Sequence, residues 1–88
     1  MSSKKHNNFL GEPMKNKEVE KIPGIGNTIG QQMKTKGITY AHQVFGQFLV
    51  LEKDKKKFCD WVKTFGANNG QSNDCYKAML EWSQQYFE

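Results

Sequence analysis

The chain has 88 residues, which is room for one small domain with a thin hydrophobic core. Its 13 basic residues are all lysine and outnumber nine acidic ones, and the resulting net charge of +4 favours a polyanionic partner. The lack of arginine argues against bidentate reading of guanine edges, and no apolar run reaches membrane-spanning length, so no membrane insertion is expected.

The first eight residues are polar, and an ordered element is first expected at Phe9 and Leu10. Ser2 and Ser3 stand beside Lys4 and Lys5 in this stretch. The pattern fits either a frayed tail or an arm that lies along a phosphate backbone, and the sequence alone favours the tail.

Two glycines, Gly24 and Gly26, interrupt an apolar pattern directly before a helix. Pro23 ends a short helix expected over residues 17–22, and the glycines allow a positive φ and the close approach of a ligand. A second helix is expected over residues 27–36, and its first N–H groups then point outward as an anion site. A tight turn without a ligand is the alternative, because Gly-x-Gly alone is a weak signal. Rossmann and Walker loops are excluded, since neither a preceding strand nor Gly-Lys-Ser/Thr is present.

Gly37 is placed to follow the C-cap of that helix, and Thr39 is the expected N-cap of a third helix over residues 40–52. Residues 48–51 are apolar almost all the way round the helix. A strand over residues 47–51 is the competing interpretation, but no turn signals bound it and no partner strand exists. Gly46 in mid-helix allows another helix or chain to come close, or is an incidental small residue.

Asp54 is the expected N-cap of a fourth helix over residues 55–65, whose lysines lie mainly off the apolar stripe. A last helix is expected over residues 71–87, and Asn69-Gly70 at its start offers a second set of N–H groups. Its core face consists of Cys75, Ala78, Met79, Trp82 and Tyr86.

Catalytic and metal chemistry have little support in the sequence. Cys59 and Cys75 lack metal-ligand spacing and are expected to be reduced thiols. His6 and His42 stand apart from any pattern of cysteines or carboxylates. The chain is therefore not expected to be an enzyme, to hold a metal or to need a cofactor.

Several blocks together resemble the barrier-to-autointegration factor family over about residues 6–87. The most specific is Gly46-Gln47-Phe48-Leu49-Val50-Leu51. The others are Glu12-Pro13-Met14, Gly24-Ile25-Gly26, Phe58-x-x-Trp61, Gly66-Ala67-Asn68 and Glu81-Trp82. The resemblance implies one compact all-α, five-helix domain over residues 1–88, with a helix-hairpin-helix motif at about 17–37, that forms a homodimer.

The resemblance also implies a function and its residues. Each subunit would hold double-stranded DNA without sequence preference, and the dimer would bridge two duplexes in the nucleus, at chromatin and the nuclear envelope, and also in the cytoplasm. A groove at the dimer interface would bind LEM-domain proteins, with lamin as a further partner. The implied DNA contacts are Lys5, Gly24, Ile25, Gly26, Asn27, Thr28, Ile29, Gln32, Asn69, Gly70 and Asn73. The implied dimer and partner groove consists of Ile38, Phe45, Gly46, Gln47, Leu49, Val50 and Leu51.

The chain departs from the family at charged positions. Family members usually carry Lys where this chain has Gln32, and Lys and Arg near Gly70 and Asn73. The alternative is therefore an interaction module that has kept dimerisation and LEM-domain binding but has weakened or lost DNA binding. We favour a working DNA bridge, because Gly24-Ile25-Gly26 is intact. The resemblance also implies phosphorylation at Ser2 and Ser3, which would repel DNA.

Overall fold

The computed structural model describes residues 4–88, and helices joined by turns and loops make up this part of the chain. Its elements are α1 (Lys4–Leu10), η1 (Val19–Lys21), α2 (Asn27–Thr35), α3 (Ala41–Val50), α4 (Lys55–Lys63), α5 (Asn69–Trp82) and η2 (Ser83–Phe87). η1 is a 3₁₀ helix and η2 is a π-helical turn. Across residues 4–88 there is no strand, only one isolated bridge between Glu18 and Tyr40, so the all-α expectation is confirmed.

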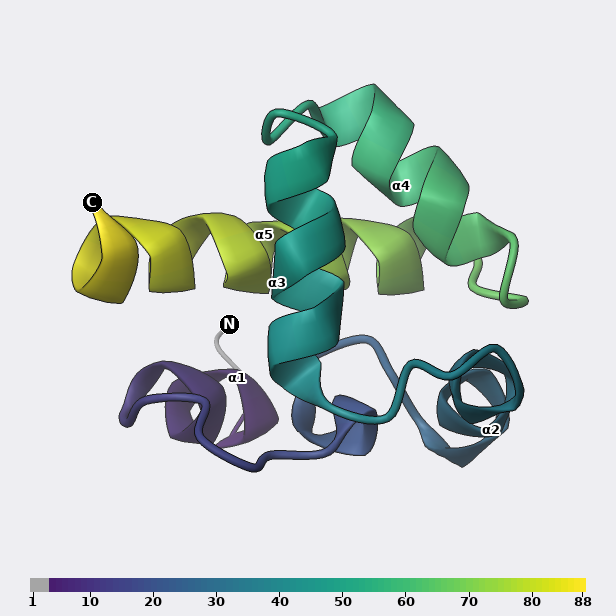
Figure 1. Ribbon diagram of the computed structural model, residues 1–88, viewed down its shortest axis with the longest axis horizontal. Coiled ribbons are helices and arrows are strands. Elements are labelled where there is room, and N and C mark those ends of the chain that lie inside the picture. The colour runs from purple at the N-terminus through teal and green to yellow at the C-terminus, as the bar shows by residue number, and fades with distance from the viewer. Residues whose placement is uncertain (1–3) are drawn as a thin grey trace.

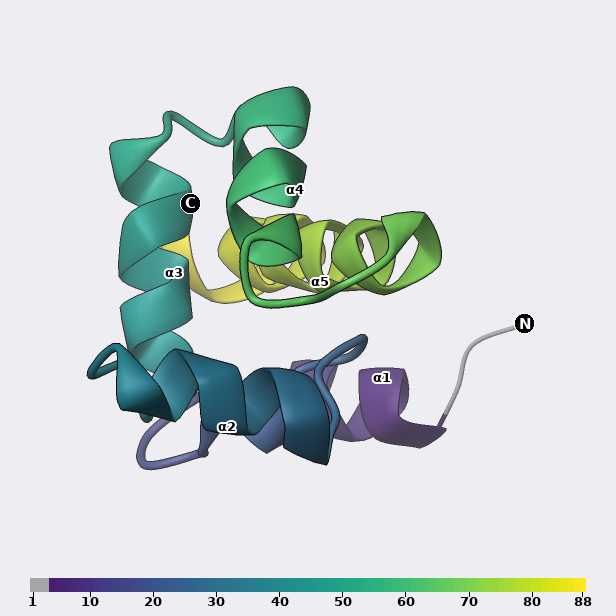
Figure 2. The same ribbon diagram turned by 90° about the vertical axis from the view of Figure 1, so that its right-hand side faces the viewer.

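The helices form two levels joined by α3. α1 and α2 lie at one end of the molecule, and α4 and α5 lie at the other (Figure 1). α3 runs along the side from one level to the other (Figure 2). Both α1 and α4 pack on α5, which makes α5 the shared support of the two levels.

Aromatic rings join three helices in the core. Phe48 of α3 and Phe58 of α4 are fully buried, with ring centroids 5.3 Å apart at 89°. Tyr76 of α5 lies 5.9 Å from Phe48. Burial of each phenylalanine stabilises the fold by roughly 1.5–3 kcal/mol. This cluster therefore holds α3, α4 and α5 together.

The expected helices around Gly37 and Asp54 are confirmed. α2 ends in a C-cap at Lys36, and Gly37 follows with a φ of +82°. Asp54 accepts a hydrogen bond from the Lys57 N–H at 2.9 Å and caps α4. The apolar run that ends α3 is helical to Val50, so the helix interpretation is correct and the strand alternative is wrong.

The tail expected over residues 2–5 is wrong for Lys4 and Lys5, which are helical. Residues 4–10 form α1, although seven residues make too short a helix to persist alone in water. Tertiary contacts supply the stability: Phe9 is 1% exposed, and the Tyr86 hydroxyl donates to the Leu10 carbonyl at 2.9 Å. Ser2 and Ser3 lie outside the described residues.

The helix expected over residues 17–22 is only the 3₁₀ turn of η1. The backbone on either side of Glu18 pairs instead with the segment before α3. The Val19 N–H donates to the Thr39 carbonyl at 3.0 Å, and the Ala41 N–H donates to the Lys17 carbonyl at 2.8 Å. These bonds hold Glu18 extended directly before η1, so an α-helix cannot run through this segment.

Thr39 is not the N-cap of α3. Tyr40 is the N-cap, and Gln43 Oε1 accepts from the N–H groups of both Thr39 and Tyr40, at 2.8 and 2.9 Å.

The last helix also departs from the expectation, since Tyr86 on its expected core face is 37% exposed. Within residues 4–88 no helix combines the length and apolar character that crossing a bilayer requires.

Candidate nucleic-acid interface

The hairpin between η1 and α2 is anchored by its isoleucines and exposes its backbone. Ile22 and Ile25 are fully buried, and the Ile25 N–H donates to the Ile22 carbonyl at 3.0 Å. Gly24 has a φ of +88°, which favours glycine strongly. The turn therefore points two side chains inward, leaves Gly24 half-buried and exposes Gly26.

Gly26 begins α2 as an N-cap that has no side chain. Its φ is −101°, its side chain would meet nothing within 4 Å, and it is exposed. Asn27 and Thr28 follow it at the surface, and no side-chain hydrogen bond caps this helix start. The N–H groups of the first turn and the positive end of the helix dipole are thus open to an anion.

The second helix start, that of α5, is capped by its own side chains. Asn68 Oδ1 accepts from the Gln71 N–H at 2.8 Å, and Gln71 Oε1 accepts from the Asn68 N–H at 2.9 Å. The spacing Asn68-x-x-Gln71 is a capping-box signal that could have placed this helix start from the sequence. Asn69 and Gly70 remain exposed at the tip of the helix.

The structure brings the hairpin and the start of α5 together. A Cβ at Gly24 would stand 2.2 Å from the Gln71 carbonyl oxygen and 3.2 Å from Asp74 Cβ. On the far side of the α5 start, the Cys59 thiol donates to Asn73 Oδ1 at 3.6 Å. The first turns of α5 therefore lie directly against the hairpin at Gln71 and Asp74.

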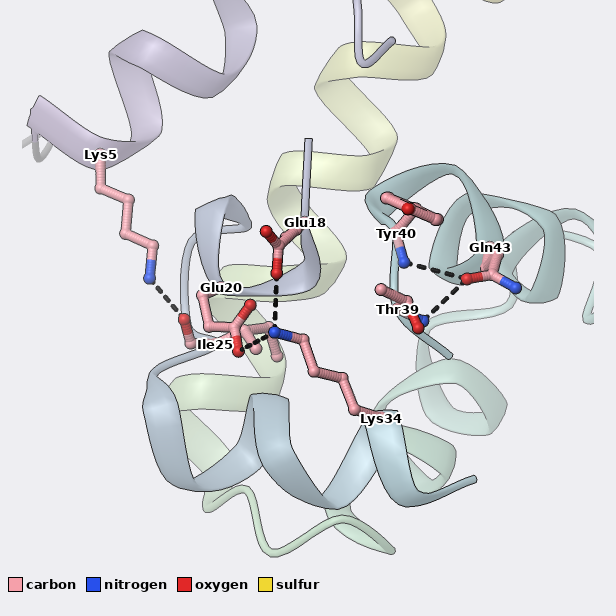
Figure 3. Close-up of polar contacts among 8 residues, drawn as sticks. All are labelled: Lys5, Glu18, Glu20, Ile25, Lys34, Thr39, Tyr40 and Gln43. Atoms are coloured by element: carbon pink, nitrogen blue, oxygen red, sulfur yellow. Dashed lines mark hydrogen bonds and ion pairs between the residues drawn. The ribbon is translucent and has the colours of Figure 1, made fainter. Parts of the chain in front are cut away.

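Lys5 reaches this region from α1. Its ammonium group donates a hydrogen bond to the Ile25 carbonyl in the hairpin (Figure 3). Burial lowers the pKa of Lys5, since removal from water disfavours the charged form. Lys5 thus fixes α1 to the hairpin and brings a positive charge beside it.

Lys34 of α2 is held by two carboxylates of the opposite segment. Its ammonium group lies 2.7 Å from Glu18 Oε1 and 3.0 Å from Glu20 Oε2 (Figure 3). Burial works against the charged form of Glu20, but the hydrogen bond and charge of Lys34, a backbone hydrogen bond and the charge of Lys5 together outweigh it, and the pKa of Glu20 is lowered. Gly30 makes room for this pair, because a Cβ there would stand 2.6 Å from Glu20 Oε2.

The outer face of α3 is a separate apolar surface. Val50 is 73% exposed, and a side chain at Gly46 would meet nothing within 4 Å. Ile38, Gln47, Leu49 and Leu51 are half-buried. Phe45 differs from these residues, because it is 7% exposed and packs inside its own chain, 5.0 Å from the Trp82 ring and 5.5 Å from the Phe87 ring.

The two histidines make ordinary contacts. His6 Nε2 lies 3.3 Å from Glu81 Oε2, and the His42 ring stacks on Tyr40 at 5.5 Å. Among residues 4–88 no three histidine, cysteine or acidic side chains come together in a way that would hold a metal ion. Cys59 and Cys75 are buried thiols that form no disulfide.

Comparison with known proteins decides the family. A family model described as "Barrier to autointegration factor" matches residues 1–86. The chain belongs to the barrier-to-autointegration factor family. It is 43% identical to the barrier-to-autointegration factor of Drosophila melanogaster over 86 residues, which cover 97% of this chain and 96% of that protein. The Danio rerio protein is 44% identical with the same coverage, and the human protein is 43% identical over 97% of both chains.

Membership of the barrier-to-autointegration factor family bears on the two surfaces in different ways. It supports a DNA-binding role for the chain. The hairpin, with its exposed N–H groups, is the part of the described structure whose chemistry suits a phosphate backbone. The apolar face of α3 suits a protein partner or a second copy of the chain instead.

Proposed function

We propose that this protein binds double-stranded DNA through the hairpin, without sequence preference. The observation that carries the proposal is the bare helix start at Gly26, which is exposed, lacks a side-chain cap and is open for at least 4 Å around its Cβ position. Backbone amides bind phosphate oxygens, which are the same at every base pair. Contacts from Gly24, Ile25, Gly26, Asn27, Thr28 and Ile29 would therefore carry no sequence information.

The start of α5 and Lys5 extend the proposed DNA surface. Asn69, Gly70 and Asn73 are exposed in the part of α5 whose Gln71 and Asp74 lie against Gly24, and Lys5 adds a charge from α1. Gln32 is exposed on α2 but carries no charge. The usual lysine or arginine contacts are absent at Gln32, Gly70 and Asn73, and each lost contact lowers the slope of log affinity against log salt by about 0.9.

We further propose that the chain is a single domain with a helix-hairpin-helix motif at about residues 17–37, and that it forms a homodimer through α3. Support comes from Gly46, whose bare Cα allows close approach, and from Val50 beside it, which is 73% exposed. A dimer joined there would carry two hairpins, and it would bridge two duplexes if they face apart. No catalytic step is part of the proposal.

The experiment that tests this function is duplex binding at two salt concentrations. A duplex of about 20 base pairs is titrated at about 50 and 200 mM salt, and light scattering gives the stoichiometry. We expect salt-dependent binding that is equal for unrelated sequences, with two duplexes per dimer. Absence of binding at the lower salt concentration would reject the proposal.

Gly26→Glu, with Gly26→Gln as its matched control, locates the binding to the hairpin. Both side chains project into open space, so both variants are expected to fold. The carboxylate that Gly26→Glu introduces repels phosphate, whereas the amide of the same size only obstructs it. We expect Gly26→Glu to abolish binding and Gly26→Gln to weaken it; unchanged binding by Gly26→Glu would remove the hairpin from the mechanism.

A second candidate function is a partner-binding dimer that does not bind DNA. The half-exposed apolar face of α3 favours it, because such a face suits a LEM-domain protein or lamin at the nuclear envelope. In this case the protein would bind an isolated LEM domain but show no duplex binding at low salt. In either case we expect the protein in the nucleus, at chromatin and the nuclear envelope, and also in the cytoplasm.

We propose that phosphorylation of Ser2 and Ser3 regulates DNA binding. These serines directly precede Lys4 and Lys5, and each phosphate adds about −1.5 to −2 charges at pH 7. Repulsion of the DNA backbone should follow. A doubly phosphorylated chain is compared with the unmodified one in the same duplex titration, and equal affinities would exclude this regulation.

A further inference from the structure

A groove of about 940 Å³ lies beside the hairpin, between α1 and the segment that leads into η1. Lys4 and Lys5 of α1 line it, and so does Lys21, the last residue of η1. Lys21 is exposed and directly precedes Ile22 and Pro23, so it stands where the chain enters the hairpin. Lys5 links the groove to the hairpin, because it lines the groove and donates a hydrogen bond to the Ile25 carbonyl.

The carboxylates along this groove are already paired. Glu12 lies 3.0 Å from Lys17, and Glu18 and Glu20 share Lys34 at 2.7 and 3.0 Å. Lys34, although close to the hairpin, is thus engaged by two acids and is poorly placed to contact a further anion.

The lysines at the mouth of the groove have no carboxylate partner. Within residues 4–88, Lys4 and Lys21 form no ion pair or side-chain hydrogen bond, and Lys5 donates only to the Ile25 carbonyl. Within residues 4–88 the charges of Lys4 and Lys21 are therefore engaged by no ion pair, whereas the charge of Lys5 is partly offset by Glu20, which lines the same groove.

Lys5 and Lys21 are close enough for their charges to interact. Burial lowers the pKa of Lys5, the charge of Glu20 opposes this, and the charge of Lys21 adds to the lowering. Two ammonium groups held near each other repel, and an anion placed between them removes the repulsion. Phosphate oxygens suit this role, because lysine binds phosphate as a compact point charge with three donors.

We propose that Lys5 and Lys21, with Lys4 at the edge of the groove, bind one phosphate group beside the hairpin. This inference rests on the proposed function: the DNA backbone held by the hairpin amides would continue into the groove. Lys21 would then supply a charge contact that Gln32, Gly70 and Asn73 do not. The site takes a phosphodiester of DNA or a free inorganic phosphate, since both present the same oxygens.

The first test compares Lys21→Gln with Lys57→Gln in duplex binding over a series of salt concentrations. Both lysines are exposed and both variants lose one charge, but Lys57 lies on α4 and not in the groove. We expect Lys21→Gln to lower the slope of log affinity against log salt by about 0.9, and Lys57→Gln to leave it unchanged. Equal slopes for the two variants would overturn the groove site while leaving hairpin binding intact.

The second test needs no DNA. The full chain is titrated with inorganic tripolyphosphate while the lysine side-chain NMR signals are followed. We expect the Lys5 and Lys21 signals to shift, the Lys5 shift to be lost in Lys21→Gln, and Lys57 to respond weakly. If the Lys5 and Lys21 signals shift but the chain binds no duplex, the groove is a site for free phosphate. That result would reject the DNA function and not the groove site. Equal shifts at Lys57, or none at Lys5, would reject the groove site.

Discussion

Gly24 lies directly against the carbonyl oxygen of Gln71, so close that a Cβ at Gly24 would stand 2.2 Å from that oxygen. The contact joins the hairpin before α2 to the first turn of α5. Only a residue without a side chain fits between them, and the φ of +88° at Gly24 imposes the same choice. This one contact makes the two helix starts parts of a single surface.

Gly24→Ala should therefore destabilise the fold more than the same change at Gly37. Both glycines have a positive φ, +88° and +82°, and alanine in this region costs about 1–2 kcal/mol. At Gly37 nothing lies within 4 Å of the added methyl, whereas at Gly24 the clash with Gln71 adds roughly 1–3 kcal/mol. Urea unfolding measures the loss of unfolding free energy in each variant. Equal losses would show that Gln71 moves away from the added methyl group without a cost in energy.

Gly46→Glu should dissociate the proposed dimer without unfolding the subunit. A side chain at Gly46 meets no atom of its own chain within 4 Å, and α3 is a helix in which glycine is unfavourable by about 1 kcal/mol relative to alanine. The added charge is harmful only if a partner chain covers this face. Sedimentation measures the mass and circular dichroism the helix content. A variant that still sediments as a dimer would move the interface elsewhere.

The pair between Glu20 and Lys34 should make stability depend on pH in the acid range. Despite partial burial, the hydrogen bond from Lys34 lowers the pKa of Glu20. Its stabilisation is thus fully present above the unfolded-state pKa of about 4.3 and is lost as pH falls through the lower folded-state pKa.

Glu20→Gln tests this dependence, because the amide keeps the contact with Gly30 but loses the charge. We expect the unfolding free energy of the variant to fall less than that of the wild type between neutral pH and about pH 3. Glu52→Gln is the matched control, since Glu52 is exposed and forms no ion pair within residues 4–88. If the unfolding free energies of wild type and Glu20→Gln changed equally with pH, the pair between Glu20 and Lys34 would not be the source of the acid dependence.

Cys75 should be inert toward thiol reagents in the folded protein. It is fully buried, and burial raises the pKa of its thiol well above the usual range. Since the thiolate is the reactive form, iodoacetamide at about pH 8 should label Cys75 only after unfolding in urea. Mass spectrometry of the native and unfolded protein checks this, and rapid native labelling would show that α4 and α5 separate readily.

The sequence determined the elements whose signals are local. Asp54 predicts the start of α4 because its side chain reaches the Lys57 N–H, and Gly37 predicts the end of α2 because it adopts a positive φ readily. Pro23, Gly24 and Gly26 also identified the hairpin, although Gly24 adopts a positive φ and Gly26 does not. Each of these signals acts within a few residues, so each can be read without knowing the rest of the fold.

Only the tertiary structure decided the elements that depend on distant partners. α1 exists because Phe9 is buried against the rest of the protein, and Glu18 is extended because the backbone on either side of it bonds to Thr39 and Ala41. The presence of Lys5 and Lys21 in one groove, and the contact of Gly24 with Gln71, likewise depend on segments far apart in the chain. A local sequence pattern does not show which distant residues will become neighbours. Burial and long-range hydrogen bonds outweigh the small helix propensities of single residues, so these elements could not be predicted locally.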